Sequence, residues 1–263
     1  MKSCDFLGIV NDAALAERKV SVYSFDCVDS TNSLARRMVL AGEISAVSLV
    51  IADGQTGGRG RMGRSFFSPA DTGIYMTLVL DVTSDSSASV MRLTSAVSVA
   101  VSRAIESVTG KSVGIKWVND LYLDGKKICG ILAESFFAGE RRYAIVGVGI
   151  NLSTRDFPSE LADIAGSLSD ADGSAFRKDL TLAVCCEMYD IYERIRRGDF
   201  SYMEEYRLRS VVLGRRVTLV RDGVIDSGVA VSVDDEGALH VRCDDGSEKA
   251  LRSGEISLRM SEV

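Results

Sequence analysis

Hydrophobic residues change their spacing along the chain, and each spacing predicts a type of element. Short apolar or alternating runs, which are typical of β-strands, occupy residues 20–28, 46–52, 73–80 and 143–152. Apolar residues recur every three or four positions, as on one face of a helix, at residues 31–41, 90–108, 176–197 and 202–209. These patterns predict an α+β fold for a first domain, which we assign to residues 1–212.

The stretch from Gly114 to Glu134 resembles a β-hairpin. One strand leads to Asp124-Gly125, a dipeptide typical of tight turns, and a second strand returns. Lysines on strands are usually solvated, but here several polar side chains gather around Trp117. They are Lys116, Asn119, Asp120 and Lys127. This clustering on the two arms of one hairpin favours a functional site.

Residues 213–263 change to short alternating segments separated by Asp-Gly and Glu-Gly turns. Short strands with regular turn signals are typical of small all-β domains. We therefore expect a second domain of about 50 residues, built as a barrel that leans on the first.

A loop rich in glycine and arginine, residues 55–69, follows the second predicted strand. Glycine lets the backbone approach a ligand closely, and arginine binds carboxylates and phosphates through two parallel hydrogen bonds. The spacing Gly58-x-Gly60-x-x-Gly63 matches a dinucleotide fingerprint, but that fingerprint must open a helix, whereas SFFSP follows here. No Walker-type GKS or GKT, HRD or DFG motif is present. The loop therefore predicts a different kind of anion site.

Composition narrows the function further. The chain has 46% hydrophobic and 26% charged residues with a net charge of −6, which is ordinary for a globular protein and disfavours a general nucleic-acid binder. No apolar run reaches the length of a membrane span, and residues 1–19 lack a secretory signal, so we expect a cytoplasmic protein.

Histidine and cysteine exclude several chemistries. His240 is the only histidine, so a zinc cluster is excluded and a Ser-His-Asp or Cys-His mechanism would depend on it alone. The six cysteines show no CxxC spacing, which favours free thiols. Chemistry must therefore rely on arginine, lysine, carboxylates and backbone amides.

Five segments together resemble a known family, the biotin protein ligases. They are DSTN (residues 29–32), GRGRMGR (58–64), KWVNDLYLDGKKICGILAE (116–134), VGVGINL (146–152) and GEISLR (254–259). The arginine loop and the KWxND hairpin are the most specific pair. The sequence departs from the family pattern at Met62, where arginine is common, and at Val118, where proline is usual.

The resemblance implies a fold and a reaction. The fold is a central mixed β-sheet with flanking helices, similar to class II aminoacyl-tRNA synthetases, plus a small SH3-like barrel. The reaction has two steps: biotin attacks the α-phosphate of Mg²⁺-bound ATP to give biotinyl-5′-adenylate, which then transfers biotin to a lysine of a biotin carboxyl carrier protein or domain.

The resemblance also implies roles for individual residues: Asn119, Asp120 and Asn151 would contact the adenylate or the metal side, and no residue is assigned as a metal ligand. Biotin would contact Ser30, Thr31, Asn32, Gln55, Gly58, Arg59, Gly60, Arg61, Lys127 and Gly130. The nucleotide would contact Arg61, Arg64, Asn119, Lys127 and Asn151. The catalytic residues would be Lys127, Arg61, Arg64 and Asp120.

The residue types support this chemistry on their own. Adenylation joins two anions, so fixed arginine, lysine and backbone N–H donors suit it, together with Mg²⁺ on the triphosphate. The attacking carboxylate is already ionised and needs no base. The acceptor lysine must lose a proton, and Asp120 is a candidate base.

Three alternatives stay open at this point. A lipoate–protein ligase or octanoyl transferase shares the fold, although the arginine loop and KWVND hairpin favour biotin. A biotin-sensing regulator or binding module would need a DNA-binding domain, and about 20 residues before the first strand are too few for one, so we expect no DNA binding. A structural domain with merely solvated arginines disagrees with the consistency of the motifs. The sequence allows a homodimer and does not identify the carrier.

Overall fold

The computed structural model describes residues 4–84, 89–169, 171–221, 224–252 and 255–258. Its larger sheet has seven strands in the order β1-β2-β3-β7-β6-β5-β4. The strands are β1 (Ser21–Val28), β2 (Ser48–Gln55), β3 (Gly73–Asp81), β4 (Gly114–Lys116), β5 (Asp120–Leu123), β6 (Lys126–Ala138) and β7 (Arg141–Asn151). Only β1 and β2 are parallel, and the other neighbours are antiparallel, so the expected mixed sheet is confirmed.

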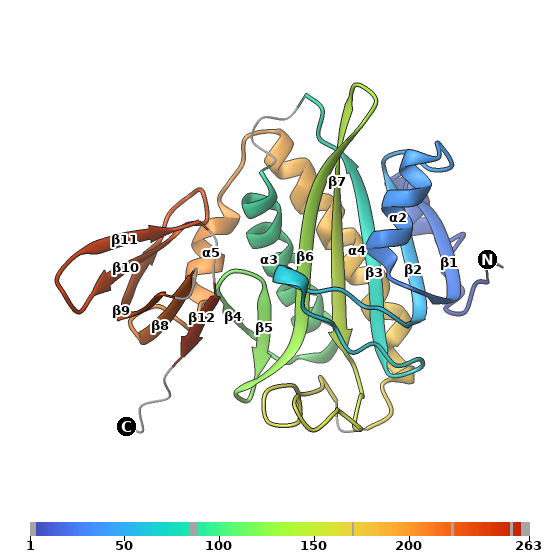
Figure 1. Cartoon of the computed structure of the whole chain (residues 1–263). Coiled ribbons are helices and arrows are strands. Elements are labelled where there is room, and N and C mark those ends of the chain that lie inside the picture. Colours follow the sequence, from blue (N-terminus) through green and yellow to red (C-terminus); the bar gives the residue numbers. More distant parts are fainter. Residues whose placement is uncertain (1–3, 85–88, 170, 222–223, 253–254, 259–263) are drawn as a thin grey trace.

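Helices cover the two faces of this sheet unequally (Figure 1). The helices are α1 (Ala13–Glu17), α2 (Thr31–Leu40), α3 (Val90–Thr109), α4 (Ser174–Arg196) and α5 (Tyr202–Arg209). The long helices α3 and α4 lie behind the sheet, which we call the back face. On the front face α2 packs on β2, β3 and β7, and the loop that follows β2 crosses the neighbouring strands.

Alternation along the strands explains what each face can hold, because successive side chains point to opposite faces. In β3, Met76 and Leu78 are fully buried in the core cluster that includes α3 and α4. The front-facing residue between them is Thr77, which pairs with Gly147 of β7. Small front-facing residues therefore leave space above the middle of the sheet.

The predicted hairpin at residues 114–134 has one more strand than expected. Residues 114–123 form two short strands, β4 and β5, which pair antiparallel with Lys116 opposite Asp120. The reversal at Trp117–Asn119 contains neither glycine nor proline, and Asn119 is its one residue of a type common in turns. The second turn is confirmed: Asp124 and Gly125 have φ of 51° and 77°, as a type I′ turn requires.

The C-terminal segment forms a second, five-stranded antiparallel sheet in the order β11-β10-β9-β8-β12. Its strands are β8 (Arg216–Arg221), β9 (Val224–Val233), β10 (Leu239–Cys243), β11 (Glu248–Leu251) and β12 (Glu255–Leu258). The expected closed barrel is wrong, because the edge strands β11 and β12 do not pair within the described residues. Each edge strand has only four residues, which leaves little backbone for closing pairs.

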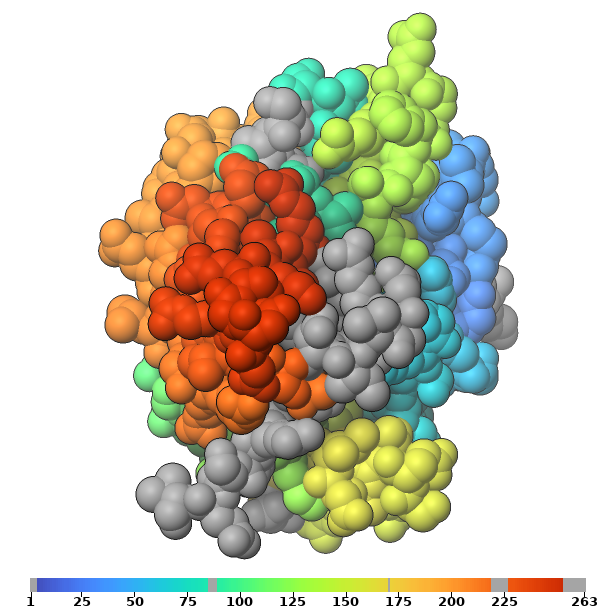
Figure 2. Space-filling view, turned by 60° about the vertical axis from the view of Figure 1, so that its left-hand side comes forward, coloured from blue at the N-terminus to red at the C-terminus, as the bar shows by residue number. Residues whose placement is uncertain are grey.

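The turn between β9 and β10 joins the second sheet to the first. The indole Nε1 of Trp117 donates a 2.9 Å hydrogen bond to the carbonyl of Gly237. Arg207 of α5 donates through Nε to the carbonyl of Val233 at 2.7 Å, and Arg92 of α3 pairs with Glu236. Figure 2 shows the C-terminal sheet (red and orange) seated against the helical part of the molecule.

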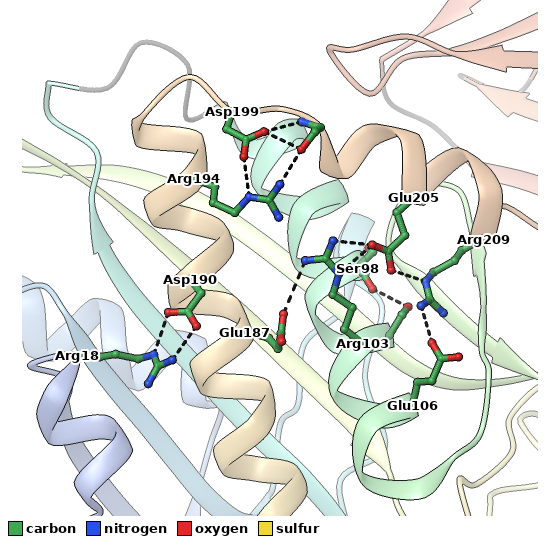
Figure 3. Close-up of polar contacts among 12 residues, drawn as sticks. Arg18, Ser98, Arg103, Glu106, Glu187, Asp190, Arg194, Asp199, Glu205 and Arg209 are labelled. Carbon is green, nitrogen blue, oxygen red and sulfur yellow. Dashed lines mark hydrogen bonds and ion pairs between the residues drawn. The ribbon is translucent and has the colours of Figure 1, made fainter.

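Ion pairs connect the helices on the back of the molecule (Figure 3). Arg103 of α3 binds Glu205 of α5 through two nitrogens, at 2.8 Å and 2.5 Å. Arg209 of α5 pairs with Glu205 and with Glu106 of α3. These contacts hold α5 against α3. Because Arg207 of α5 also binds the carbonyl of Val233, they help to hold the turn between β9 and β10 in place.

Candidate active site

The glycine–arginine loop has a firmly held stem. Gln55 donates its backbone N–H to the carbonyl of Ser68 at 3.0 Å, and the Tyr75 hydroxyl donates to the carbonyl of Pro69 at 2.9 Å. A Cβ at Gly58 would lie 2.3 Å from the carbonyl oxygen of Phe66. Glycine is therefore required at position 58 by the returning arm of the loop itself.

The tip of the loop places Arg61 inward. A short 3-10 turn (Arg61–Gly63) forms there, and Gly60 donates its N–H to the carbonyl of Arg64 at 2.7 Å. Arg61 donates to Asn119 Oδ1 at 3.1 Å. Burial lowers the pKa of Arg61, and the nearby Asp120 carboxylate partly opposes that shift. A guanidinium held this way favours an incoming anion, because an anion replaces the lost hydration.

Lys127 and Asp120 form the second charged centre. Lys127 Nζ lies 2.7 Å from Asp120 Oδ1, and the two residues stand on the paired strands β6 and β5. The buried Oδ1 of Asp120 therefore faces the Lys127 ammonium, whereas the buried Oδ1 of Asn151 has no hydrogen-bond donor. Burial, followed by the charge of Asp120, raises the pKa of the adjacent Tyr122 to about 12.

Residues 155–166 form a wall beside Lys127. Lys127 donates its N–H to the carbonyl of Ile164 at 2.9 Å and accepts at its own carbonyl from Gly166 at 2.8 Å. Asn151 Nδ2 also donates to the Gly166 carbonyl, at 3.1 Å. The ring of Phe157 in this wall lies near the ring of Phe67 in the glycine–arginine loop, with ring centroids 6.2 Å apart. The wall is thus hydrogen-bonded to β6 at Lys127 and to the end of β7 at Asn151.

A neutral polar end lies where α2 begins. Ser30 is the N-cap of α2, but its side chain makes no capping hydrogen bond. The N–H of Thr31 donates instead to Gln55 Oε1 at 2.8 Å, and Gln55 Nε2 donates to Ser68 Oγ at 2.9 Å. The strand–helix junction and the stem of the loop are therefore one hydrogen-bonded unit.

Two glycines of β7 make room for side chains at this end. A Cβ at Gly147 would lie 2.2 Å from Asn32 Oδ1, and one at Gly149 would lie 2.6 Å from the ring of Phe66. Glycines at these positions indicate that another group lies close to the β7 backbone. The structure shows that this group is a side chain in both cases and not another backbone. The missing side chains of these glycines let Asn32 and Phe66 pack directly against β7.

The charged centre and the neutral end line one cavity of about 380 Å³. All the residues assigned to the site from the sequence line it except Gly58. They are Ser30, Thr31, Asn32, Gln55, Arg59, Gly60, Arg61, Arg64, Asn119, Asp120, Lys127, Gly130 and Asn151. Among the described residues, no group of three histidine, cysteine or acidic side chains could hold a metal ion.

Comparisons with known proteins bear on this cavity. The model of the Biotin/lipoate A/B protein ligase family matches residues 24–151, and that of the Biotin protein ligase C terminal domain matches residues 212–259. The bifunctional ligase/repressor BirA of Bacillus spizizenii is 35% identical over 246 residues, which are 89% of this chain and 72% of that protein. The chain belongs to the biotin protein ligase family.

Other relatives agree. The biotin–acetyl-CoA-carboxylase ligase of Mycobacterium tuberculosis is 31% identical over 80% of this chain and 79% of its own length. The structure of the Aquifex aeolicus biotin protein ligase in complex with biotin and ATP superposes with a TM-score of 0.78, at 28% identity, over 91% of this chain and 99% of that one. The second sheet thus has the position of a biotin protein ligase C-terminal domain despite its open edge.

The structure adds lining residues that had no assigned role in the sequence. They include Phe66, Phe67, Tyr122, Leu132, Phe157, Leu161, Ile164 and Ala165, with Lys116 and Trp117 from the polar hairpin. The wall at residues 155–166 contains no regular strand or helix, so hydrophobic periodicity gave no signal for it. Among the described residues no helix is both long and apolar enough to cross a membrane.

Proposed function

We propose that this biotin protein ligase activates biotin with ATP and transfers it to a specific lysine of a biotin carboxyl carrier protein or domain. The observation that best supports this proposal is a single cavity with a cationic end, at Arg61 and Lys127, and a neutral polar end, at Ser30 and Thr31. The likeness to the Aquifex ligase in complex with biotin and ATP supports the same assignment.

The two ends suit the two ends of biotin. Its carboxylate fits beside Arg61 and Lys127, where cationic donors meet the nucleotide phosphates. Its uncharged ureido ring then lies at the neutral end, and the aliphatic chain lies between them along Phe66 and Leu132. Lipoate has no ring donors for the neutral end, so this chemistry favours biotin.

The first step is attack of the biotin carboxylate on the α-phosphate, which releases pyrophosphate. Arg61, Arg64 and Lys127 neutralise the repulsion between the two anions and the charge that develops on phosphorus. Asn119 holds Arg61 in place through its amide oxygen. The aromatic and aliphatic wall around the cavity excludes water from the mixed anhydride that forms.

We propose Mg²⁺ as an ion bound mainly through the triphosphate. Magnesium prefers oxygen ligands and commonly binds through one or two protein oxygens plus phosphates. The buried Oδ1 of Asn151, which accepts no hydrogen bond, fits that role. When bound, the ion would neutralise phosphate charge.

In the second step the acceptor lysine must lose a proton before it attacks the adenylate carbonyl. We propose Asp120 as the base, because its carboxyl group belongs to the cavity lining beside Lys127. A new amide bond forms, and AMP leaves with the bonding electrons.

The domain boundaries and the cellular location predicted from the sequence are also part of this proposal. We assign two domains, residues 1–212 and 213–263, and a cytoplasmic location without DNA binding. A homodimer and the identity of the carrier are questions for solution experiments.

The function is tested by incubating the full chain with Mg²⁺, ATP, biotin and an isolated biotin carrier domain. We expect the carrier to gain one biotinyl group by mass spectrometry, and a carrier with its target lysine changed to arginine to gain none. Equal labelling of both carriers, or of neither, would contradict the proposal.

A further inference from the structure

A continuous row of polar side chains underlies the neutral end of the cavity. It runs from Arg59 on the loop to Glu134 of β6, then to Asn32 of α2 and Thr77 of β3, and it ends at Thr31. Glu134 and Thr77 do not line the cavity, and neither has an assigned role, although Glu134 ends the 116–134 motif.

The orientation of Asn32 is determined by its neighbours. Its amide nitrogen lies 3.1 Å from the carbonyl oxygen of Leu132 and 3.1 Å from Glu134 Oε2. A carbonyl and a carboxylate only accept hydrogen bonds, so the NH₂ group of Asn32 must face them and its Oδ1 must face Thr77. Glu134 is held in turn by two contacts from the Arg59 guanidinium, at 2.9 Å and 3.2 Å.

That orientation sets the direction of the next two bonds. Asn32 Oδ1 can only accept, so the Thr77 hydroxyl donates to it at 2.7 Å. The single hydrogen of the Thr77 hydroxyl lies within reach of both Asn32 Oδ1 and Thr31 Oγ1, at 2.7 Å and 2.8 Å; when it points to Asn32, the contact with Thr31 is satisfied by donation from Thr31. The hydroxyl hydrogen of Thr31 thus has two acceptors within the protein, Thr77 Oγ1 and Gln55 Oε1 at 3.3 Å, so its lone pairs face the cavity.

The packing shows that the row is built into the sheet. Thr77 is fully buried, and Asn32 and Thr31 are almost so. Thr77 pairs across the strands with Gly147, whose missing Cβ provides the space for the Asn32 amide. A fully connected buried network of this kind holds each member in one orientation.

We propose that Glu134, Asn32 and Thr77 are positioning residues that make the Thr31 hydroxyl an obligatory hydrogen-bond acceptor, so that the cavity selects ligands offering an N–H donor. The inference rests on the proposed function, because it places the ureido ring at this end. It also changes the role of Asn32, whose amide is fully used by protein groups, from a biotin contact to a support.

The ligand chemistry follows. A cyclic urea offers two N–H donors, whereas a cyclic carbonate of the same shape, with oxygen in place of both nitrogens, offers none. The carbonate analogue would bring a lone pair against the lone pairs of Thr31. A dithiolane or a simple fatty acyl chain likewise provides no N–H donor at this position.

The test is calorimetric titration of biotin, and of its carbonate analogue, into the full chain and two variants at Thr77. Thr77→Val removes both hydrogen bonds of Thr77 and leaves the longer contact with Gln55 Oε1, at 3.3 Å, as the one protein acceptor for the Thr31 hydrogen, which is then freer to turn into the cavity. We expect it to weaken biotin binding by about tenfold to hundredfold and to lower the preference for biotin over the carbonate by at least about tenfold. Thr77→Ser keeps the hydroxyl and should stay within about threefold of the original affinity.

Two further readouts separate positioning from general damage. The KM for ATP should change by less than about threefold in Thr77→Val. Glu134→Gln leaves Arg59 and Asn32 competing for one acceptor oxygen, so it should also weaken biotin binding. Because both variants break one row, the double variant should lose less affinity than the product of the two single losses.

The possible results are distinct. Unchanged biotin affinity and unchanged preference in Thr77→Val would overturn the inference, as would strictly multiplicative losses in the double variant. If Thr77→Val does not fold, Glu134→Gln decides, and unchanged biotin affinity in that variant overturns the inference. If the unaltered chain binds no biotin, the proposed function itself fails.

Discussion

The front and the back of the molecule both carry connected polar side chains, but of opposite kinds. At the cavity floor, the inner members Thr31, Asn32 and Thr77 are short, uncharged and buried, and only the outer Arg59–Glu134 pair is charged. Behind the sheet, Arg103 and Glu205 are long, charged and partly exposed, at 30% and 25% of their side-chain surface (Figure 3). The first network controls the direction of hydrogen bonds, and the second holds helices together.

The difference has energetic consequences. Exposed ion pairs contribute about 0–1 kcal/mol each, because water and salt screen them. A buried polar group that loses its partner costs about 1–3 kcal/mol. Substitutions at the front should therefore change ligand binding strongly, whereas substitutions at the back should change stability slightly and leave binding intact.

The largest effect is expected for Lys127→Met, which removes a cation from the reacting end. Adenylate formation should fall about a hundredfold to a thousandfold, because a preorganised donor to the developing charge is lost. Pyrophosphate release measures this step. Lys126→Met is the matched control, since Lys126 points to the carbonyl of Ala162 and does not line the cavity. Equal losses in both variants would remove Lys127 from the reacting end.

Arg61→Gly should release adenylate about tenfold to hundredfold faster, because a charged hydrogen-bond donor at the loop tip is lost. The released adenylate should label nearby lysines without selection, which mass spectrometry of a bystander protein can detect. Met62→Gly is the control for loop flexibility, since Met62 already has a φ of 55° that glycine adopts readily. Equal rates of adenylate release from the two variants would contradict a role for Arg61 in retaining the adenylate.

Gly147→Ala should weaken biotin binding and lower the free energy of unfolding by about 1–3 kcal/mol. Its new Cβ would lie 2.2 Å from Asn32 Oδ1 and would displace the floor network. Val146→Ala, at a fully buried neighbouring position on the back face, should cost about 2 kcal/mol of stability and leave biotin affinity unchanged. Calorimetry and urea unfolding distinguish the two, and intact biotin binding in Gly147→Ala would refute the floor assignment.

Trp117→Phe tests the joint between the two sheets. It removes the 2.9 Å bond to Gly237 and leaves a buried carbonyl without its donor, at a cost of about 1–2 kcal/mol. Hydrogen exchange at residues 234–239 should accelerate, since that turn loses an anchor. Unchanged exchange there would mean that Arg92 and Arg207 hold the turn on their own.

The smallest effect is expected for Glu205→Gln on the back face, at under about 1 kcal/mol with biotin binding intact. Burial raises the pKa of Glu205, but the hydrogen bonds from Arg103 and Arg209 outweigh it, so the net pKa is lowered. A lowered pKa stabilises the fold above the ordinary value of 4.5 and loses that contribution as the pH falls below it. The stability gap to the original chain should therefore narrow below that pH in urea titrations, and a gap that widens would contradict the sign.

Particular elements show how far the sequence alone could lead. Periodicity located α2, β3 and β7, and the glycine–arginine loop identified the anion site, because these signals are local. The reversal between β4 and β5 was missed because Trp117–Asn119 has neither glycine nor proline, and Asn119 was interpreted as a site residue. The C-terminal barrel was wrong because closure depends on pairing between β11 and β12, which no local pattern reports.

The floor network lay beyond motif reasoning for a similar reason. Thr77 and Glu134 look like ordinary strand residues in the sequence, and only the pairing of β3, β7 and β6 brings them to Asn32. One signal was available: Gly130, Leu132 and Glu134 alternate along β6, which places all three on the front face. Which residues of β3, β6 and β7 lie next to Asn32 depends on the register between strands that are distant in the sequence.

The most direct test of the central claim is native mass spectrometry of the chain with Mg²⁺ and ATP, and with either biotin or lipoate, in the absence of a carrier. We predict that biotinyl-adenylate forms and stays bound with biotin, and that no adenylate forms with lipoate. Lipoyl-adenylate alone would overturn the substrate and keep the chemistry. Neither adenylate would contradict the account of the cavity as an adenylation site.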